Sequence, residues 1–325
     1  MIPFSILDLC PITEGGSAAQ SLRHSLDLAQ HAERWGYKRF WLAEHHSLPG
    51  IASAATSVLI AHIGAGTKTI RIGAGGIMLP NHAPLVIAEQ FGTLESLYPG
   101  RVDLGLGRAP GSDQATSQAL RRHPAAGEDF PQDVGELLHW FAPERPGQQV
   151  VAVPGAGLKV PIWILGSSTW GAQFAAVNGF PYAFAAHFAP QQMMQALELY
   201  RSLFKPSEWL DKPYAMLGVN VVAADTDEEA RLLFTSRQQS TLAIRAGRRS
   251  LLPPPDPQFE KRLGPMERAL LDELMPGSIV GSADSVKQGL AKFIEKTGAD
   301  ELIIAAQIFD HAARLRSYEI VATAR

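Results

Sequence analysis

Cysteine is nearly absent from this chain, since Cys10 is the single one among 325 residues. One cysteine cannot form an internal disulfide, and it cannot supply a cluster of thiolate metal ligands. Such sparing use of cysteine is typical of proteins in a reducing compartment. We therefore expect a cytoplasmic protein without structural crosslinks.

Long apolar runs are missing too. No run approaches the roughly 20 residues that a membrane-spanning helix needs, and the start, Met1-Ile2-Pro3-Phe4, has no basic segment followed by an apolar core. A large charge of one sign is also absent, because 29 basic residues stand against 32 acidic ones, a formal net charge of -3. We expect neither a membrane nor a nucleic-acid partner, which leaves a small-molecule substrate as the default ligand.

What the chain does contain is a regular alternation of strands and helices. Short apolar segments that begin at Phe4, Lys38, Ile70 and Val102 predict strands, and their starts lie 34, 32 and 32 residues apart. Segments with helical periodicity lie between them at 18–35, 52–64 and 85–98, and each ends close to a glycine. The first third of the chain therefore predicts successive βα units.

The remainder of the chain continues this alternation. Further strands are predicted at 160–165, 181–185, 214–223 and 301–305, with helices at 171–178, 190–204, 226–246 and 283–297. Eight strands with intervening helices predict an α/β fold, a (β/α)8 TIM barrel, as a single domain over residues 1–325.

Such a barrel leaves about 75 residues for insertions. We expect them at 109–159, after the fourth strand, and at 246–276, after the seventh. For the second insertion, a mobile lid and a plain surface excursion are both open.

A doubly wound open sheet is the alternative fold, because it also alternates strands and helices. A dinucleotide-binding sheet needs a G-x-G-x-x-G turn after its first strand, whereas residues 10–17 read Cys-Pro-Ile-Thr-Glu-Gly-Gly-Ser. The missing fingerprint favours the barrel.

Charged residues mark the end of the second predicted strand, where Glu44, His45 and His46 follow an apolar segment. Catalytic groups of a barrel lie at the C-terminal ends of its strands. Neighbouring residues on an extended chain point to opposite sides, so the two histidines are poorly placed to share a metal ion. We therefore favour proton transfer by one histidine, and a structural role for its neighbour, over a metal site.

The next two strand ends carry glycine and arginine. Gly75 and Gly76 lie inside the third strand and indicate either a bulge, with a flat ligand close to the backbone, or simple packing in a narrow barrel neck. Arg108 ends the fourth strand. Its guanidinium suits a phosphate or carboxylate, and a surface ion pair is the alternative.

The fifth strand ends in Gly166, Ser167 and Ser168, directly before a helix predicted to begin near Trp170. Backbone N–H groups at a helix N-terminus are unpaired and attract anions, although a serine there also serves as an ordinary cap. Because these serines follow the strand next to the one that ends in Arg108, we favour a phosphate site.

Taken in order, the segments 41–46, 71–80, 98–108, 164–168, 280–281 and 297–301 resemble the bacterial-luciferase-like flavin monooxygenases nearly end to end. The resemblance implies a barrel that binds reduced FMN, with the isoalloxazine over the mouth and the phosphate between Arg108 and the backbone of Ser167 and Ser168. It matches His45 to the histidine that takes part in catalytic proton transfer, with Glu44 orienting it. The Gly75-Gly76 bond falls where the family has a non-proline cis peptide beneath the flavin.

The resemblance also implies an activity, an FMN-dependent monooxygenase that oxygenates a small organic substrate with O2. A separate flavin reductase is expected, because no nicotinamide motif is visible, and so is a homodimer formed through the early helices. Two positions depart from luciferase itself: Gly107 stands where luciferase has a reactive cysteine, and Gly166 where it has a glutamate. The pattern is closer to the uncharacterised branch of the family than to the light-emitting subunits.

Three other functions remain open from the sequence. A deazaflavin-dependent dehydrogenase or reductase would use a related barrel, a non-catalytic flavin-binding barrel would bind without turnover, and a metal-dependent hydrolase would contain zinc or manganese. Three further residues are weaker candidates for the pocket lining: His187, Gln307 and Asp8.

Overall fold

Eight parallel strands close into a barrel in the computed structural model, which describes residues 2–109, 113–123 and 126–324. The ring runs β6-β5-β4-β3-β2-β1-β9-β7, and a pairing between β6 and β7 closes it. The strands are β1 (Phe4–Asp8), β2 (Arg39–Leu42), β3 (Arg71–Met78), β4 (Val102–Gly107), β5 (Ile162–Gly166), β6 (Tyr182–Phe184), β7 (Ala215–Ala223) and β9 (Glu301–Ala305). The predicted (β/α)8 barrel is confirmed.

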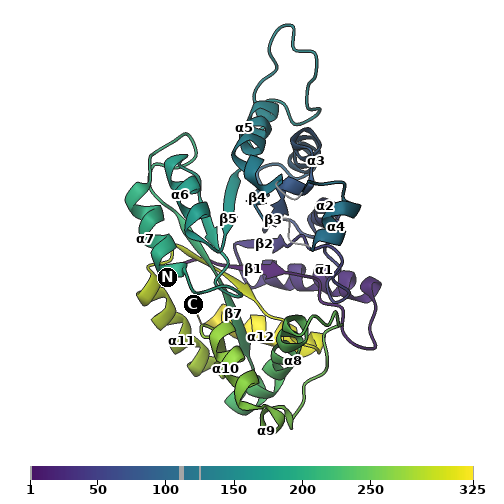
Figure 1. Cartoon of the computed structure of the whole chain (residues 1–325), viewed down its shortest axis with the longest axis vertical. Coiled ribbons are helices and arrows are strands. Elements are labelled where there is room, and N and C mark those ends of the chain that lie inside the picture. The colour runs from purple at the N-terminus through teal and green to yellow at the C-terminus, as the bar shows by residue number, and fades with distance from the viewer. Residues whose placement is uncertain (1, 110–112, 124–125, 325) are drawn as a thin grey trace.

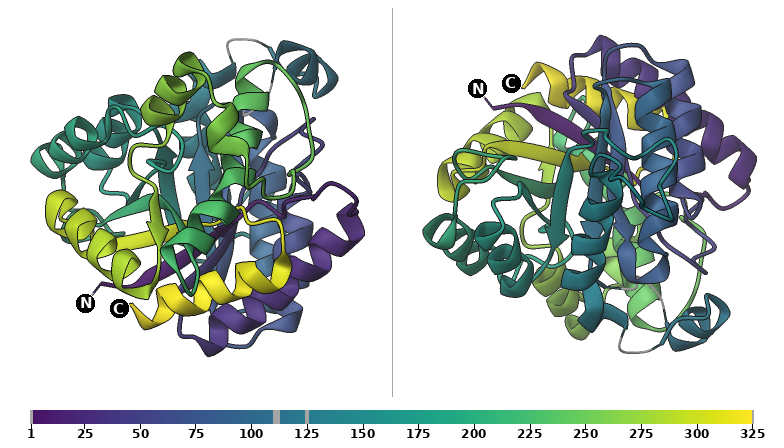
Figure 2. Two further views of the ribbon diagram at one scale, coloured as in Figure 1. Left: turned by 90° about the horizontal axis from the view of Figure 1, so that it is seen from below. Right: turned by 90° about the horizontal axis from the view of Figure 1, so that it is seen from above.

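The helices surround these strands (Figures 1 and 2). The longer ones are α1 (Ala18–Arg34), α2 (Thr56–Gly66), α3 (Pro84–Leu97), α5 (Phe130–Phe141), α6 (Thr169–Val177), α7 (Met193–Leu203), α8 (Asp227–Arg245), α10 (Pro265–Leu274), α11 (Ala283–Thr297) and α12 (His311–Thr323). Shorter helical turns are η1 (Leu79–Asn81), α4 (Gln114–Ala119), η2 (Ala126–Asp129) and α9 (Phe259–Arg262). Over the described residues, no helix combines the length and the apolar character of a membrane span.

Several elements were not expected from the sequence, among them α12 and the two that follow. The segment predicted as the first insertion contains α5, whose buried Phe130, Val134, Leu137 and Phe141 pack it beside α3 as the helix of the fourth βα unit. A short strand, β8 (Ile279–Gly281), pairs with the C-terminal half of β7. Less of the chain is therefore inserted than we predicted.

The second insertion, which carries α9 and α10, lies at one end of the long axis in Figure 1, and the loop after α5 lies at the other. Leu252 in this insertion forms a parallel bridge with Thr13, with its N–H 2.9 Å from the carbonyl oxygen of Ile12. The guanidinium of Arg249 donates to Ser47 at 2.8 Å and pairs with Asp113. These contacts tie the insertion to the loops that follow β1, β2 and β4.

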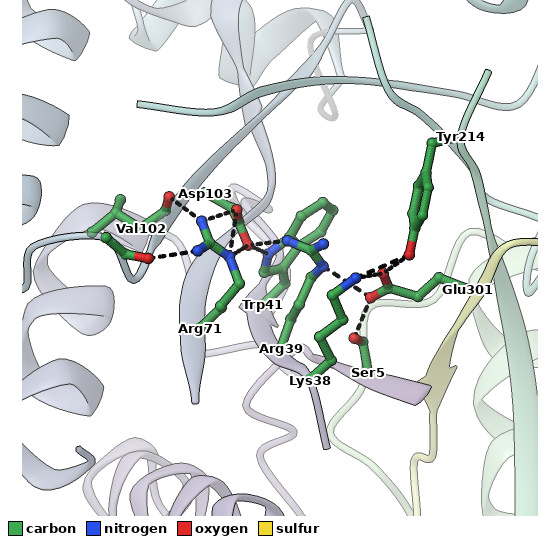
Figure 3. Close-up of polar contacts among 10 residues, drawn as sticks. Ser5, Lys38, Arg39, Trp41, Arg71, Val102, Asp103, Tyr214 and Glu301 are labelled. Carbon is green, nitrogen blue, oxygen red and sulfur yellow. Dashed lines mark hydrogen bonds and ion pairs between the residues drawn. The ribbon is translucent and has the colours of Figure 1, made fainter. Parts of the chain in front are cut away.

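A layer of buried charge fills the barrel near the N-terminal ends of the strands (Figure 3). Arg39 lies between two carboxylates, with Nη1 2.7 Å from Asp103 and Nε 2.9 Å from Glu301. Arg71 reaches the other oxygen of Asp103 at 2.6 Å, and Lys38 lies 3.2 Å from Glu301. Each carboxylate thus has two cationic partners, which is what allows the charges to be buried.

An apolar layer lies above this charge, two residues further along each strand, because side chains of a strand alternate between the barrel interior and the helices. The indole rings of Trp41 and Trp163 meet edge to face, with centroids 5.3 Å apart. Around them pack the other members of this layer: Leu7, Ala43, Ala183, Met216 and Ile303. This apolar layer forms the floor of the cavity at the C-terminal ends of the strands.

Candidate active site

A pocket of about 1030 Å³ opens above this floor, at the C-terminal ends of the strands. Small-molecule and cofactor pockets measure roughly 300–1,000 Å³, so this one is at the large end of that range. Its lining includes nearly all the residues singled out from the sequence: His45, His46, Gly75, Gly76, Arg108, Gly166, Ser167, Ser168, His187 and Gln307. Residues from six strand ends are therefore brought to one cavity.

Two of the sequence candidates lie outside this lining. Asp8 is fully buried, where its carboxylate pairs with Arg314 at 2.6 Å and accepts from Ser25. Glu44 is also fully buried, beneath the loop that carries the two histidines. Asp8 therefore serves the packing between β1 and α12 rather than the pocket.

The peptide bond between Gly75 and Gly76 is cis, as predicted, and the pairing of β3 with β4 is shifted in register at this point. A Cβ atom on Gly75 would lie 2.7 Å from the side chain of Leu7, and one on Gly76 would lie 2.7 Å from the carbonyl oxygen of Gly105. Neither position has space for a side chain. Both residues line the pocket, so a flat ring can lie against their bare backbone.

Arg108 and Trp170 form one wall of the pocket. The guanidinium carbon of Arg108 lies 4.2 Å from the centroid of the Trp170 ring, a cation–π arrangement. Trp170 is in the first turn of α6, directly after the serines at the end of β5. The stacking therefore holds a permanent positive charge beside the N-terminus of this helix.

At the N-terminus of α6 the N–H of Thr169 donates to Oε1 of Gln192 at 3.3 Å, and the N–H groups that follow it in the first turn are available to an anion. Ser168 is its N-cap, yet its side chain makes no capping hydrogen bond. The first backbone N–H groups of a helix have no partner within the helix and carry the positive end of its dipole. With Arg108, two serine hydroxyls and these N–H groups, the donor set fits the phosphate of FMN.

Glu44 is the centre of a hydrogen-bonded cluster at the ends of β2 and β3. Its carboxylate accepts from Nε2 of His46 at 2.7 Å, from Nε2 of His82 at 3.0 Å and from the backbone N–H of Met78 at 2.9 Å. Burial alone would raise the pKa of Glu44, but the hydrogen bond and charge of His82 lower it below its usual value. These bonds fix the ends of β2 and β3 together, and an orienting role of Glu44 toward His45 stays a prediction.

His45 lines the pocket on the neighbouring position of the same loop, whereas the ring of His46 is engaged with Glu44. The structural role predicted for one histidine of the doublet thus falls to His46. His45 also lies close enough to His187 to disfavour a second charge there. The two imidazoles share the mouth of the barrel.

His187 is a neutral imidazole. Its ring lies against the backbone of Gly218, where a Cβ atom would come within 2.3 Å of Nδ1. Burial lowers the pKa of His187 to about 3, and the charges of Arg237 and His45 contribute in the same direction. The ring therefore remains uncharged throughout the physiological range.

This pKa predicts a pH dependence of stability. Between pH 6.5 and about 3 the unfolded chain binds a proton at His187 that the folded chain does not, so the free energy of unfolding falls as the pH falls. Replacing His187 by Gln is expected to reduce the proton uptake on unfolding by about one near pH 5. Urea unfolding at a series of pH values measures this slope, and an unchanged slope would contradict the assignment.

Among the pocket residues that were not predicted from the sequence are Trp170 and Arg237. Trp170 could have been found from its position as the second residue of the helix that follows the serines. Arg237 lies within α8, where a single arginine in an amphipathic helix gives no signal of its own. Within the part of the chain that the structure describes, no group of three acidic, histidine or cysteine side chains is arranged to hold a metal ion.

The sequence and the fold are similar to those of known monooxygenases. A family model described as luciferase-like monooxygenase matches residues 2–301. A luciferase-like monooxygenase of Escherichia coli (strain K12) is 55% identical over 320 residues, covering 98% of this chain and 96% of that protein. An N-acetyl-S-alkylcysteine monooxygenase of Bacillus subtilis (strain 168) is 36% identical over 262 residues, covering 77% of this chain and 76% of the other.

A solved structure gives the same result in three dimensions. The crystal structure of apo-MsnO8 superposes with a TM-score of 0.93 at 36% sequence identity. The match covers 100% of this chain and 98% of that one.

Proposed function

Because the chain belongs to the luciferase-like monooxygenase family and is a flavin-dependent oxidoreductase, we propose that it uses reduced FMN and O2 to oxygenate a small organic molecule. The proposal rests on a candidate phosphate site at the pocket wall. This site, the cradle, consists of Arg108 and the N-terminus of α6. Arg108, stacked on Trp170, stands beside the N-terminus of α6, and the side-chain-free backbone of Gly75 and Gly76 faces the same cavity. The two features suit the phosphate and the flat ring of FMN.

In this proposal FMN supplies the electrons that activate dioxygen, and the protein supplies binding, orientation and proton transfer. Arg108 and the hydroxyls of Ser167 and Ser168 hold the phosphate, with the backbone at Gly166 leaving space for it. Gly75 and Gly76 support the ring from below. His45 moves a proton through a ring nitrogen at the pocket mouth.

Exclusion of water is the second task of the pocket. Most of the floor is apolar, formed by Leu7, Trp41 and Ile303. The second insertion is bound to Thr13, Ser47 and Asp113 around the rim. An insertion fixed across the rim, above an apolar floor, shields reactive groups from bulk water. We propose that the second insertion acts as a lid in this way.

We propose a separate flavin reductase as the source of reduced FMN, because the turn after β1 lacks the glycine fingerprint of a nicotinamide site. A deazaflavin-dependent dehydrogenase is the second candidate for the same barrel. It needs hydride transfer and no dioxygen, so the two functions differ in their requirement for O2.

The test supplies chemically reduced FMN and 18O2 to the purified protein with N-acetyl-S-benzylcysteine, chosen because a relative is named for N-acetyl-S-alkylcysteines. Transfer of one 18O atom to the product, measured by mass spectrometry, is the expected result. Anaerobic hydride transfer from reduced deazaflavin, with no binding of reduced FMN, would contradict the proposal in favour of the dehydrogenase. Tight FMN binding without oxygen transfer to this or any other assayed substrate would favour a non-catalytic flavin-binding barrel.

We also propose that the protein is a homodimer formed through α2 and α3. Val58 on α2 is 66% exposed, and Val86 and Leu97 on α3 are 41% and 58% exposed. The two α3 residues lie eleven positions apart, three helical turns, and so share one face. Sedimentation of the native chain, with Leu97→Glu as the disrupting variant, distinguishes the dimer from a monomer.

A further inference from the structure

A guanidinium without a counter-charge faces the pocket from α8. Arg237 donates from Nη1 to Oε1 of Gln307 at 2.7 Å. Its Nε is shielded from solvent and has no hydrogen-bond partner. Among the described residues, no carboxylate lies within ion-pairing distance of Arg237, and burial lowers the pKa of this side chain to about 10.

Arg237 is half-buried, and the buried arginines of the barrel have carboxylate partners. Arg39 pairs with Asp103 and Glu301, and Arg314 pairs with Asp8. A cation with a donor shielded from water and no anionic partner is unfavourable, and such groups are normally paired within the protein. The exception at Arg237 indicates that its partner comes from outside the chain.

The hydrogen bonds of Arg237 leave one edge of the guanidinium available. Gln307 occupies Nη1, so Nε and Nη2 remain side by side, which is the pair of donors that binds a carboxylate through two parallel hydrogen bonds. Because arginine has no acceptor, the amide oxygen of Gln307 must face it, and the amide nitrogen is left as a further donor. Buried Nδ1 of His187, which also has no partner, lines the same pocket.

These groups lie away from the phosphate cradle. Gln307 follows β9, and β9 stands four places from β4 in the closed ring of eight strands, directly across the barrel from Arg108. One phosphate cannot serve both places. Among the described residues that line the pocket, positive charge predominates, with five arginines against a single aspartate: Arg108, Arg237, Arg245, Arg248, Arg249 and Asp113.

We propose that Arg237, together with Gln307, binds a carboxylate of the substrate, so that the enzyme acts on an organic acid with an apolar remainder. The inference rests on the proposed function, since it places the second molecule opposite the FMN phosphate. The apolar floor formed by Leu7, Trp41 and Ile303 lies between the two anion sites and receives the rest of the molecule.

The test compares octanoate with octanamide, which have the same shape and differ in charge. Both are titrated calorimetrically into the FMN-loaded protein, so that Arg108 is already occupied. We expect octanoate to bind about 30-fold more tightly than octanamide, and Arg237→Gln to remove that preference while octanamide binding stays the same. Arg231→Gln is the matched control, because Arg231 lies on the same helix, exposed and paired with Glu228.

The outcomes separate the two proposals. If FMN fails to bind, the proposed function fails, and the titration is repeated without flavin in the Arg108→Gln chain, where the octanoate preference is still expected. Equal binding of octanoate and octanamide, or a preference that survives Arg237→Gln, overturns the carboxylate site. Loss of reduced-FMN affinity in Arg237→Gln, without any carboxylate preference in the native chain, overturns it as well and assigns Arg237 to the flavin.

Discussion

Replacing His45 by Ala is expected to lower the single-turnover rate of oxygenation by about 10²- to 10⁴-fold, the usual contribution of a positioned acid or base. His45 follows β2, two places from β4 in the ring, whereas Arg108 follows β4, so the affinity for reduced FMN should change little. Rapid mixing of the reduced FMN complex with O2 and substrate measures the rate, and anaerobic titration measures the affinity.

Two controls distinguish proton transfer from a structural effect. Added imidazole should restore part of the activity of His45→Ala, because a small base can enter the space left by the ring. His62→Ala, at an exposed histidine of α2, should behave like the native protein. Unchanged turnover in His45→Ala would remove this residue from the mechanism.

Replacing Asp103 by Asn is expected to lower the free energy of unfolding by about 3–5 kcal/mol, the typical loss when one partner of a buried ion pair is removed. Asp103 is fully buried and accepts from Arg39, Arg71 and the indole N–H of Trp41. An amide of the same size leaves Arg39 with Glu301 as its remaining carboxylate partner and takes away the carboxylate that pairs with Arg71. It also turns an NH2 group toward these cations.

A surface ion pair provides the comparison for Asp103. Asp225 pairs with Arg316 at 2.8 Å, but the two side chains are 65% and 51% exposed. Asp225→Asn should therefore cost less than about 1 kcal/mol. Urea unfolding of both variants measures the difference, and a loss at Asp103 no larger than that at Asp225 would mean that the charged layer does not stabilise the barrel.

The strands of the barrel could be predicted from the sequence because each is a short apolar segment at a regular interval. The strand at 301–305 was placed to the residue, and most others to within two. Helix α5 was missed although Phe130, Val134, Leu137 and Phe141 have helical spacing, because the whole segment after β4 was assigned to an insertion. Strand β8 has only three residues, too few for a pattern.

The pocket was easier to predict than the contacts beneath it. Residues at the ends of neighbouring parallel strands must meet at one end of a barrel, so Arg108, Ser167 and Gly75 could be grouped from the fold alone. The partners of Glu44 could not, because His82 lies 38 residues further on, in the turn after β3. The Arg39–Glu301 pair joins residues 262 positions apart, and no local pattern reports such a contact.

The central claim is that the cradle formed by Arg108 and the N-terminus of α6 binds the phosphate of FMN. Its most direct test is the ratio of the dissociation constants of reduced riboflavin and reduced FMN, which differ only in that phosphate, for the native chain and for Arg108→Gln. The native protein should prefer FMN by about 100-fold, and the variant should lose at least about tenfold of this preference while its affinity for riboflavin stays the same. A ratio that is the same in both proteins would contradict the account.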